Sequence, residues 1–253
     1  MAMITKAQQK LIRSLEQKKF REREGLFVAE GPKVVGDLME AGFEAVMTFR
    51  APADITEEEL QRISFLQHPQ GVLAVFKKPL QTSAFQLQTS KLILALDGVQ
   101  DPGNLGTIIR IADWFGIDEI VCSKDTADCW APKVVQATMG SIARVHILYK
   151  DLAELLDEAE RNDVPVYGTL LDGRNIYEEE LTEGGIIIMG NEGNGISPAL
   201  RTRIKRKLFI PDFHQGRTAD SLNVAIATAI TCSEFRRRGS GGQPHHPSGK
   251  APA

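Results

Sequence analysis

The chain has 253 residues, a formal net charge of −3 at pH 7 and an apolar share of 42%. These values are typical of a soluble protein with one large domain or two smaller ones. The longest apolar runs, residues 92–96 and 186–189, are far shorter than the roughly 20 residues that span a bilayer. The first residues lack the apolar core of a signal peptide, so a cytoplasmic protein is expected.

Strands and helices alternate along residues 1–78, which predicts a small N-terminal α/β domain. Thr56 is followed by acidic residues and is a candidate for a capping box. The expected elements are an amphipathic helix at 5–19, strands at 26–29, 43–49 and 71–76, and helices at 33–41 and from 56.

Residues 79–91 carry Pro79 and many Gln, Thr and Ser residues without strong periodicity, which predicts a linker. Regular alternation of strands and helices then predicts a larger α/β domain at 92–238 with a parallel sheet. The tail at 239–253 is rich in Gly, Pro, Ser and His and is predicted to be disordered. The expected strands are 92–96, 119–122, 145–149, 164–169, 185–189 and 207–210, with a last helix at about 221–237.

The cysteines are odd in number and lack metal-ligand spacing, which indicates free thiols in a reducing compartment: Cys122, Cys129 and Cys232. No metal site is expected elsewhere. Two basic clusters are candidate phosphate contacts or, alternatively, solvated faces. They are Lys6, Lys10, Arg13, Lys18, Lys19, Arg21 and Arg23, and then Arg201, Arg203, Lys205, Arg206 and Lys207.

A first polar cluster, at residues 101–106, follows the apolar strand at 92–96. Asn104 is either a helix cap or a site residue. Arg110 lies among apolar neighbours in the following helix, so it requires a partner or a polar cavity. The alternatives are a structural ion pair, for example with Asp113, and a contact to a nucleotide phosphate through its planar donor fork.

A second cluster, at residues 190–195, follows the apolar strand at 185–189 and presents Glu192. Its glycines permit tight turns and close ligand approach, although a plain glycine turn with a solvated Glu192 is the alternative. Pro198 is suited to the first position of a short helix. The glycine order G-x-x-G-x-G differs from the dinucleotide-binding order G-x-G-x-x-G, which disfavours a redox cofactor.

A third cluster begins at Ile210 and Pro211, where a strand ends, and continues at Ser221, Leu222 and Asn223. Ser221 is a candidate cap for the last helix. The small residues that follow provide a face for close packing, at 225, 227 and 229.

In this order, the three clusters resemble the three motifs of the SpoU/TrmH family of RNA 2′-O-ribose methyltransferases. Residues 27–33 and 69–75 are similar to the RNA-binding substrate domain of several members. The resemblance implies a small α/β RNA-binding domain, an α/β domain with a deep trefoil knot, and a homodimer. It also implies direct, metal-free methyl transfer from S-adenosyl-L-methionine to a ribose 2′-hydroxyl.

The resemblance also assigns residues. Arg110 is implied to help deprotonate the attacking hydroxyl, although phosphate positioning and alkoxide stabilisation suit an arginine better. Glu192 is implied to orient its neighbours or to pair with an arginine. The implied catalytic residues are Asn104, Arg110, Glu192, Ser221 and Asn223. The implied cofactor-binding residues are Leu170, Gly190, Asn191, Gly195, Ile210 and Leu222.

Two departures from the family pattern are visible. The loop before Ser221 is longer than usual, with an added Arg217 as a further candidate RNA contact, and Ala225 stands where serine is frequent. Ribosomal RNA is the expected substrate because the N-terminal domain resembles those of ribosomal RNA enzymes. The alternatives are a transfer RNA ribose methyltransferase, a non-catalytic RNA-binding protein of the same fold and, from another class, a nucleotide-binding oxidoreductase.

Overall fold

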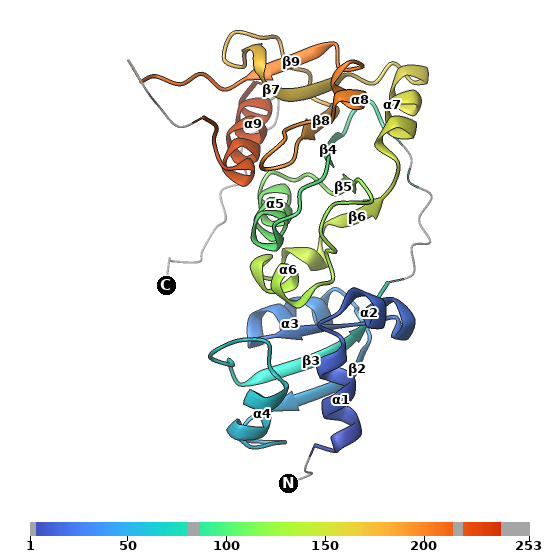
Figure 1. The fold of residues 1–253 in the computed structure, drawn as a ribbon, viewed down its shortest axis with the longest axis vertical. Coiled ribbons are helices and arrows are strands. Elements are labelled where there is room, and N and C mark those ends of the chain that lie inside the picture. Colours follow the sequence, from blue (N-terminus) through green and yellow to red (C-terminus); the bar gives the residue numbers. More distant parts are fainter. Residues whose placement is uncertain (1–3, 80–84, 86, 215–219, 239–253) are drawn as a thin grey trace.

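The computed structural model describes residues 4–79, 85, 87–214 and 220–238. It contains two sheets, one above the other along the long axis of the molecule (Figure 1). The lower sheet is antiparallel with the order β1-β3-β2. Its strands are β1 (Leu26–Glu30), β2 (Ala45–Arg50) and β3 (Val72–Lys77), accompanied by α1 (Lys6–Ser14), α2 (Lys18–Glu24), α3 (Pro32–Glu40) and α4 (Glu57–Ile63).

The single helix expected at 5–19 is wrong, because the chain turns between α1 and α2. The guanidinium of Arg21 explains the break. Its Nη1 donates hydrogen bonds of 2.7 Å to the carbonyl oxygens of Leu15 and Glu16, which satisfies backbone acceptors where α1 ends. The capping box at the start of α4 is confirmed, with Thr56 and Glu59 exchanging hydrogen bonds.

The upper sheet has six parallel strands in the order β6-β5-β4-β8-β7-β9. They are β4 (Leu92–Leu96), β5 (Glu119–Cys122), β6 (His146–Tyr149), β7 (Val166–Asn175), β8 (Gly185–Met189) and β9 (Arg206–Phe209). The helices are α5 (Pro102–Trp114), α6 (Pro132–Ala137), η1 (Ser141–Ala143, a 3-10 turn), α7 (Leu152–Arg161), α8 (Pro198–Arg201) and α9 (Val224–Arg238). The expected α/β class with a parallel sheet is confirmed.

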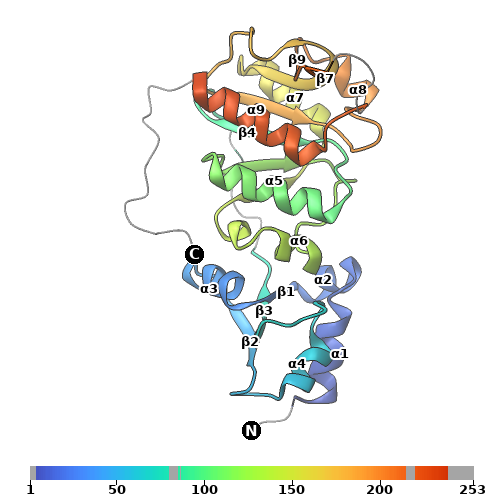
Figure 2. The ribbon, with the colours of Figure 1, turned by 90° about the vertical axis from the view of Figure 1, so that its left-hand side faces the viewer.

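Strand β4 is buried on both faces, and alternate residues pack into different clusters. Leu94 belongs to the cluster that contains residues of α5 and α9, whereas Ile93 packs with residues of α7 and α8. Figure 2 shows α5 and α9 side by side on one face of the sheet, in agreement with their contacts. Coverage of both faces accounts for the continuous apolar runs of β4 and β8.

The two sheets belong to parts of the chain that pack firmly together. Phe27 of β1 lies 4.5 Å, centroid to centroid, from Trp130, and one buried apolar cluster contains residues from both parts. Arg21 and Asp128 form a buried ion pair of 2.6 Å. The first sheet ends at Lys77 and the second begins at Leu92. We propose the domain boundary within this interval; the expected disordered tail and Arg217 lie outside the described residues.

The three cysteines are free and buried, as expected. Burial raises the pKa of the thiols of Cys129 and Cys232 to about 12 and that of Cys122 well above its ordinary value. These thiols therefore act as packing groups. Within the parts of the chain that the structure describes, no helix is long and apolar enough to cross a membrane.

Candidate active site

The three polar clusters follow the carboxyl ends of parallel strands. Asp97 follows β4, Gly190 follows β8 and Ile210 follows β9. Since these strands are parallel, their carboxyl ends share one edge of the sheet. Ligand sites of open α/β sheets lie at this edge.

A chain of hydrogen bonds joins one residue from each cluster. Nδ2 of Asn223 donates to Oδ1 of Asn104 at 2.9 Å, and Nδ2 of Asn104 donates to Oε1 of Glu192 at 3.1 Å. The Glu192 carboxylate also accepts from the backbone amides of Gln100, at 3.2 Å, and Asp101, at 3.0 Å. Segments far apart in sequence thereby form one polar site, with Glu192 as an acceptor at its centre.

The pKa of Glu192 follows from this arrangement. Partial burial acts to raise it, but hydrogen bonds from the Asn104 side chain and from the backbone amides of Glu192, Asp101 and Gln100 together lower it below its ordinary value. The carboxylate is therefore ionised at neutral pH. Glu192 is exposed, but its hydrogen bonds to Asn104, Gln100 and Asp101 distinguish it from a solvated residue of a plain glycine turn.

Two caps differ from those expected. Asp101, not Asn104, caps α5, because its Oδ1 accepts from the Asn104 amide at 2.8 Å. At α9, Oδ1 of Asn223 accepts from the amides of Ala225 and Ile226 at 2.9 and 3.3 Å, so Asn223 takes the capping role expected of Ser221. The side chain of Asn104 is left available for the polar site.

Arg110 is exposed, on the outer face of α5. It has no hydrogen bond or ion pair with any residue of the described ranges. The alternative of a structural ion pair with Asp113 is wrong, because Asp113 binds Arg144 at 2.7 Å. Ser221 is also exposed and joins no hydrogen bond there. The structure thus unites three of the five expected catalytic residues and leaves these two as predictions.

The glycine-rich loop is closed on itself. Asn191 and Gly195 exchange two backbone hydrogen bonds of 2.9 Å. A Cβ on Gly190 would lie 2.2 Å from the carbonyl carbon of Gly195, so the loop requires glycine there. Gly195 adopts φ +68°, with open space where a Cβ would point. Pro198 occupies the first turn of α8, as expected.

The remaining expected cofactor residues differ in exposure. Leu170 is buried in the apolar cluster on the α7 side of the sheet, and Ile210 is half-buried. Leu222 is 50% exposed although it is a large apolar residue. Their roles in cofactor binding stay predictions.

The basic clusters are largely occupied by structural contacts. Arg21 is buried in its ion pair with Asp128, so an RNA contact by Arg21 is wrong. In the second cluster four side chains pair with carboxylates, namely Arg201, Arg203, Lys205 and Lys207, and Arg206 lies over the ring of Tyr167.

Sequence reasoning missed Asp97, and it did not foresee that Asn191, an expected cofactor residue, also holds the site loops together. Oδ2 of Asp97 accepts from the Ser197 amide at 2.6 Å, and Nδ2 of Asn191 donates to the Gly98 carbonyl at 2.7 Å. These bonds tie the first cluster to the second. The sequence feature that could have identified Asp97 is its position as the first polar residue after a buried strand. In the described residues no group of His, Cys, Asp and Glu forms a metal-binding cluster.

Comparisons with known proteins agree with this geometry. The SpoU rRNA Methylase family matches residues 91–233, and the MRM3-like substrate binding domain matches residues 6–55. The 23S rRNA (guanosine(2553)-2′-O)-methyltransferase RlmP of Bacillus subtilis is 32% identical over 239 residues, which cover 88% of this chain and 94% of that protein.

Solved structures are similar over nearly the whole chain. A TrmH-family protein of Porphyromonas gingivalis has a TM-score of 0.84 and 42% identity, covering 94% of this chain and 100% of the other. The AdoMet-bound rRNA methyltransferase of Sinorhizobium meliloti has a TM-score of 0.82 and 31% identity, covering 93% and 97%. Fold and site thus define a methyltransferase of the trefoil-knot type. The chain belongs to the SpoU rRNA methylase family.

Proposed function

We propose that this protein transfers a methyl group from S-adenosyl-L-methionine to a ribose 2′-hydroxyl of ribosomal RNA. The observation that carries the proposal is the hydrogen-bond chain from Asn223 through Asn104 to Glu192, which joins the three family motifs at one sheet edge. Relatives that cover most of the chain are named as rRNA methyltransferases, which favours ribosomal over transfer RNA.

The residues present fit the cofactor. Gly195 offers backbone without a side chain in open space, which permits close approach of a ligand. Ile210 and the half-exposed Leu222 supply apolar surface suited to a flat adenine ring, and Leu170 follows the β7 residues that pair with β8. With Gly190 and Asn191 they form our proposed cofactor site. When bound, S-adenosyl-L-methionine supplies a methyl group carried on a positively charged sulfur.

The side chains of the site position and stabilise the reacting ribose. Glu192 stays ionised and fixes the amide of Asn104, while Asn223 holds the opposite side of that amide. We assign to Arg110 the orientation of the substrate phosphate and the stabilisation of negative charge on the 2′-oxygen, because its guanidinium is exposed and uncommitted among the described residues. Ser221 is assigned to the edge of the same polar site.

Such positioning lowers the barrier by holding reactants in line and by preorganised electrostatics.

A homodimer is part of the proposal. Arg110 and Trp114 lie on the outer face of α5, and Trp114 is 85% exposed. On the neighbouring α9, Ile226 is 53% exposed. Large apolar side chains exposed on adjacent helices mark an interaction surface, and a second copy of the chain would cover it. A cytoplasmic location, where free thiols persist, completes the proposal.

The deciding experiment is transfer of tritiated methyl from S-adenosyl-L-methionine to RNA from a strain that lacks the gene. Incorporation into one ribosomal RNA species, absent with RNA from the parent strain, is the expected result. Incorporation into transfer RNA would overturn the substrate assignment. Absence of both cofactor binding and incorporation would favour a non-catalytic RNA-binding protein.

A further inference from the structure

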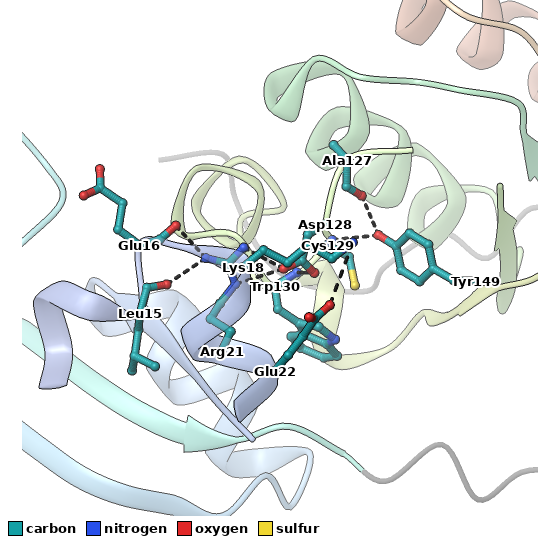
Figure 3. A network of polar contacts seen from close by, with 10 residues as sticks. All are labelled: Leu15, Glu16, Lys18, Arg21, Glu22, Ala127, Asp128, Cys129, Trp130 and Tyr149. Atoms are coloured by element: carbon teal, nitrogen blue, oxygen red, sulfur yellow. Dashed lines mark hydrogen bonds and ion pairs between the residues drawn. The ribbon is translucent and has the colours of Figure 1, made fainter. Parts of the chain in front are cut away.

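A second site is indicated by a groove between the two parts of the molecule, away from Glu192. The groove has a volume of about 630 Å³. One wall comes from the N-terminal part, with Lys18 of α2, Phe43 and Lys78. The other wall contains Trp130 and every residue from 142 to 149. Figure 3 shows Lys18, Trp130 and Tyr149 around this junction.

The groove follows the open edge of the upper sheet. β6 is the terminal strand of the sheet, and among the described residues no further strand pairs with its outer side. All four residues of β6 line the groove, so the outer edge of the sheet borders it.

Positive charge prevails in the groove. The Asp128 carboxylate is neutralised by Arg21 at 2.6 Å, and Glu22 lies 3.9 Å from the ammonium of Lys18. Lys78 and Lys124 also line the groove, and neither forms an ion pair within the described parts of the chain. Two uncommitted ammonium groups on opposite walls make the groove complementary to an anionic chain.

An aromatic side chain lies beside these cations. The indole of Trp130 is half-buried and packs against Phe27 at 4.5 Å and, across the junction, against Phe43 at 6.2 Å, centroid to centroid. A fixed indole next to lysines is the combination with which proteins hold single-stranded nucleic acid, stacking bases and contacting phosphates. A peptide strand would use the β6 edge but would leave the lysines without partners.

One lining residue of the groove, Lys124, lies close to the candidate active site in the fold. Lys124 lies just after β5, and β5 is the direct neighbour of β4, whose loop carries Asn104. Adjacent strands are about 4.8 Å apart. The loops also touch, since a Cβ on Gly98 would lie 3.0 Å from Oδ2 of Asp125.

We propose that this groove binds single-stranded RNA adjacent to the target nucleotide, with phosphates at Lys78 and Lys124 and a base against Trp130. This inference rests on the proposed function in one respect, namely that the bound RNA is the substrate of the methyl transfer. The binding itself is tested without turnover.

The experiment uses the full-length protein and a fluorescein-labelled, single-stranded RNA of twelve nucleotides. Anisotropy titrations compare the parent with Lys78→Gln/Lys124→Gln. At physiological salt, loss of two phosphate contacts is expected to weaken binding about tenfold and to reduce the slope of log K against log salt by about 1.4. Lys205→Gln is the matched control, because Lys205 is 85% exposed near β9, at the opposite edge of the sheet.

Fluorescence supplies a second readout. The chain has two tryptophans, so Trp114→Phe leaves Trp130 as the only one. RNA is expected to quench its emission in this background, and the double lysine variant is expected to remove that quenching at the same RNA concentration. Unchanged affinity and slope in the double variant would overturn the inference, as would failure of the parent to bind the RNA.

Other outcomes separate this inference from the proposed function. Binding of poly-glutamate as tight as that of RNA, without quenching of Trp130, would overturn it in favour of an acidic protein partner. Groove-dependent RNA binding without methyl transfer would support the groove while contradicting the proposed function. If the protein transfers methyl groups but the double variant binds RNA as tightly as the parent, the proposed function is supported and the groove proposal is contradicted.

Discussion

Asn223 donates a 2.9 Å hydrogen bond to Asn104 although 119 positions separate the two residues. The same Asn223 side chain accepts from the first amides of α9 through its Oδ1. Both halves of the amide are therefore used, one for the helix and one for the site. Asn223→Ala is expected to remove all three of these bonds, whereas Asn223→Asp retains the cap while losing the donor to Asn104.

The first prediction concerns Arg110. Arg110→Ala is expected to lower methyl transfer at least a hundredfold, because preorganised charge at the reacting oxygen is lost. Its exposure and lack of described partners predict a change of unfolding free energy within about 0.5 kcal/mol, with cofactor binding retained. Turnover, urea unfolding and cofactor titration measure these effects. Arg161→Ala, another exposed arginine, is the control; parental turnover in Arg110→Ala would refute the assigned role.

The second prediction concerns pH. A carboxyl whose pKa is lower in the folded state stabilises the fold above its unfolded pKa, and this contribution disappears as pH falls through the folded pKa. The pKa of Glu192 is lowered in this way. Glu192→Gln is therefore expected to cost about 1 kcal/mol at pH 7, limited by solvent screening, and progressively less as pH falls below 4.5, the ordinary pKa of a glutamate carboxyl.

Urea unfolding of the parent and of Glu192→Gln, from pH 7 to below 4.5, measures the difference in their unfolding free energies. Glu183→Gln, at an exposed position without a described hydrogen bond, is the control. A cost for Glu192→Gln that does not change with pH would contradict the role of its ionised carboxylate.

The third prediction compares two glycines of one loop. Gly190→Ala places a Cβ 2.2 Å from the backbone of Gly195, and is expected to cost about 2 kcal/mol and to abolish cofactor binding. Gly193→Ala meets only Oδ1 of Asn191 at 3.6 Å and is expected to preserve both properties. Thermal unfolding with and without S-adenosyl-L-methionine reports both effects. If the two variants had the same stability and the same cofactor binding, closure of the loop would be excluded as the reason why position 190 requires glycine.

The fourth prediction concerns the junction of the two parts. Arg21→Met leaves Asp128 buried without its partner and is expected to cost about 3–5 kcal/mol. Adding Asp128→Leu is expected to recover part of that loss, because the unpaired charge is removed. Arg23→Met, at a side chain that is 64% exposed, is the control. Urea unfolding measures all four proteins, and a double variant less stable than Arg21→Met would contradict the explanation.

The sequence predicted most strands to within about three residues, because β4 and β8 are buried apolar runs and because glycines mark boundaries such as those at Gly71 and Gly190. The break between α1 and α2 was missed, since it depends on Arg21 reaching carbonyls of the preceding helix. The catalytic set was expected from family resemblance. Its hydrogen bonds were not, because the contact of Asn223 with Asn104 depends on strand order rather than on local pattern.

The position of Asn223 late in the sequence also determines when during synthesis the polar site can be completed. Since α9 follows every described strand, the polar site lacks one of its members until α9 has been synthesised and has docked. A growing chain in which α9 has not yet docked therefore contains the substrate-binding part but an incomplete reaction centre.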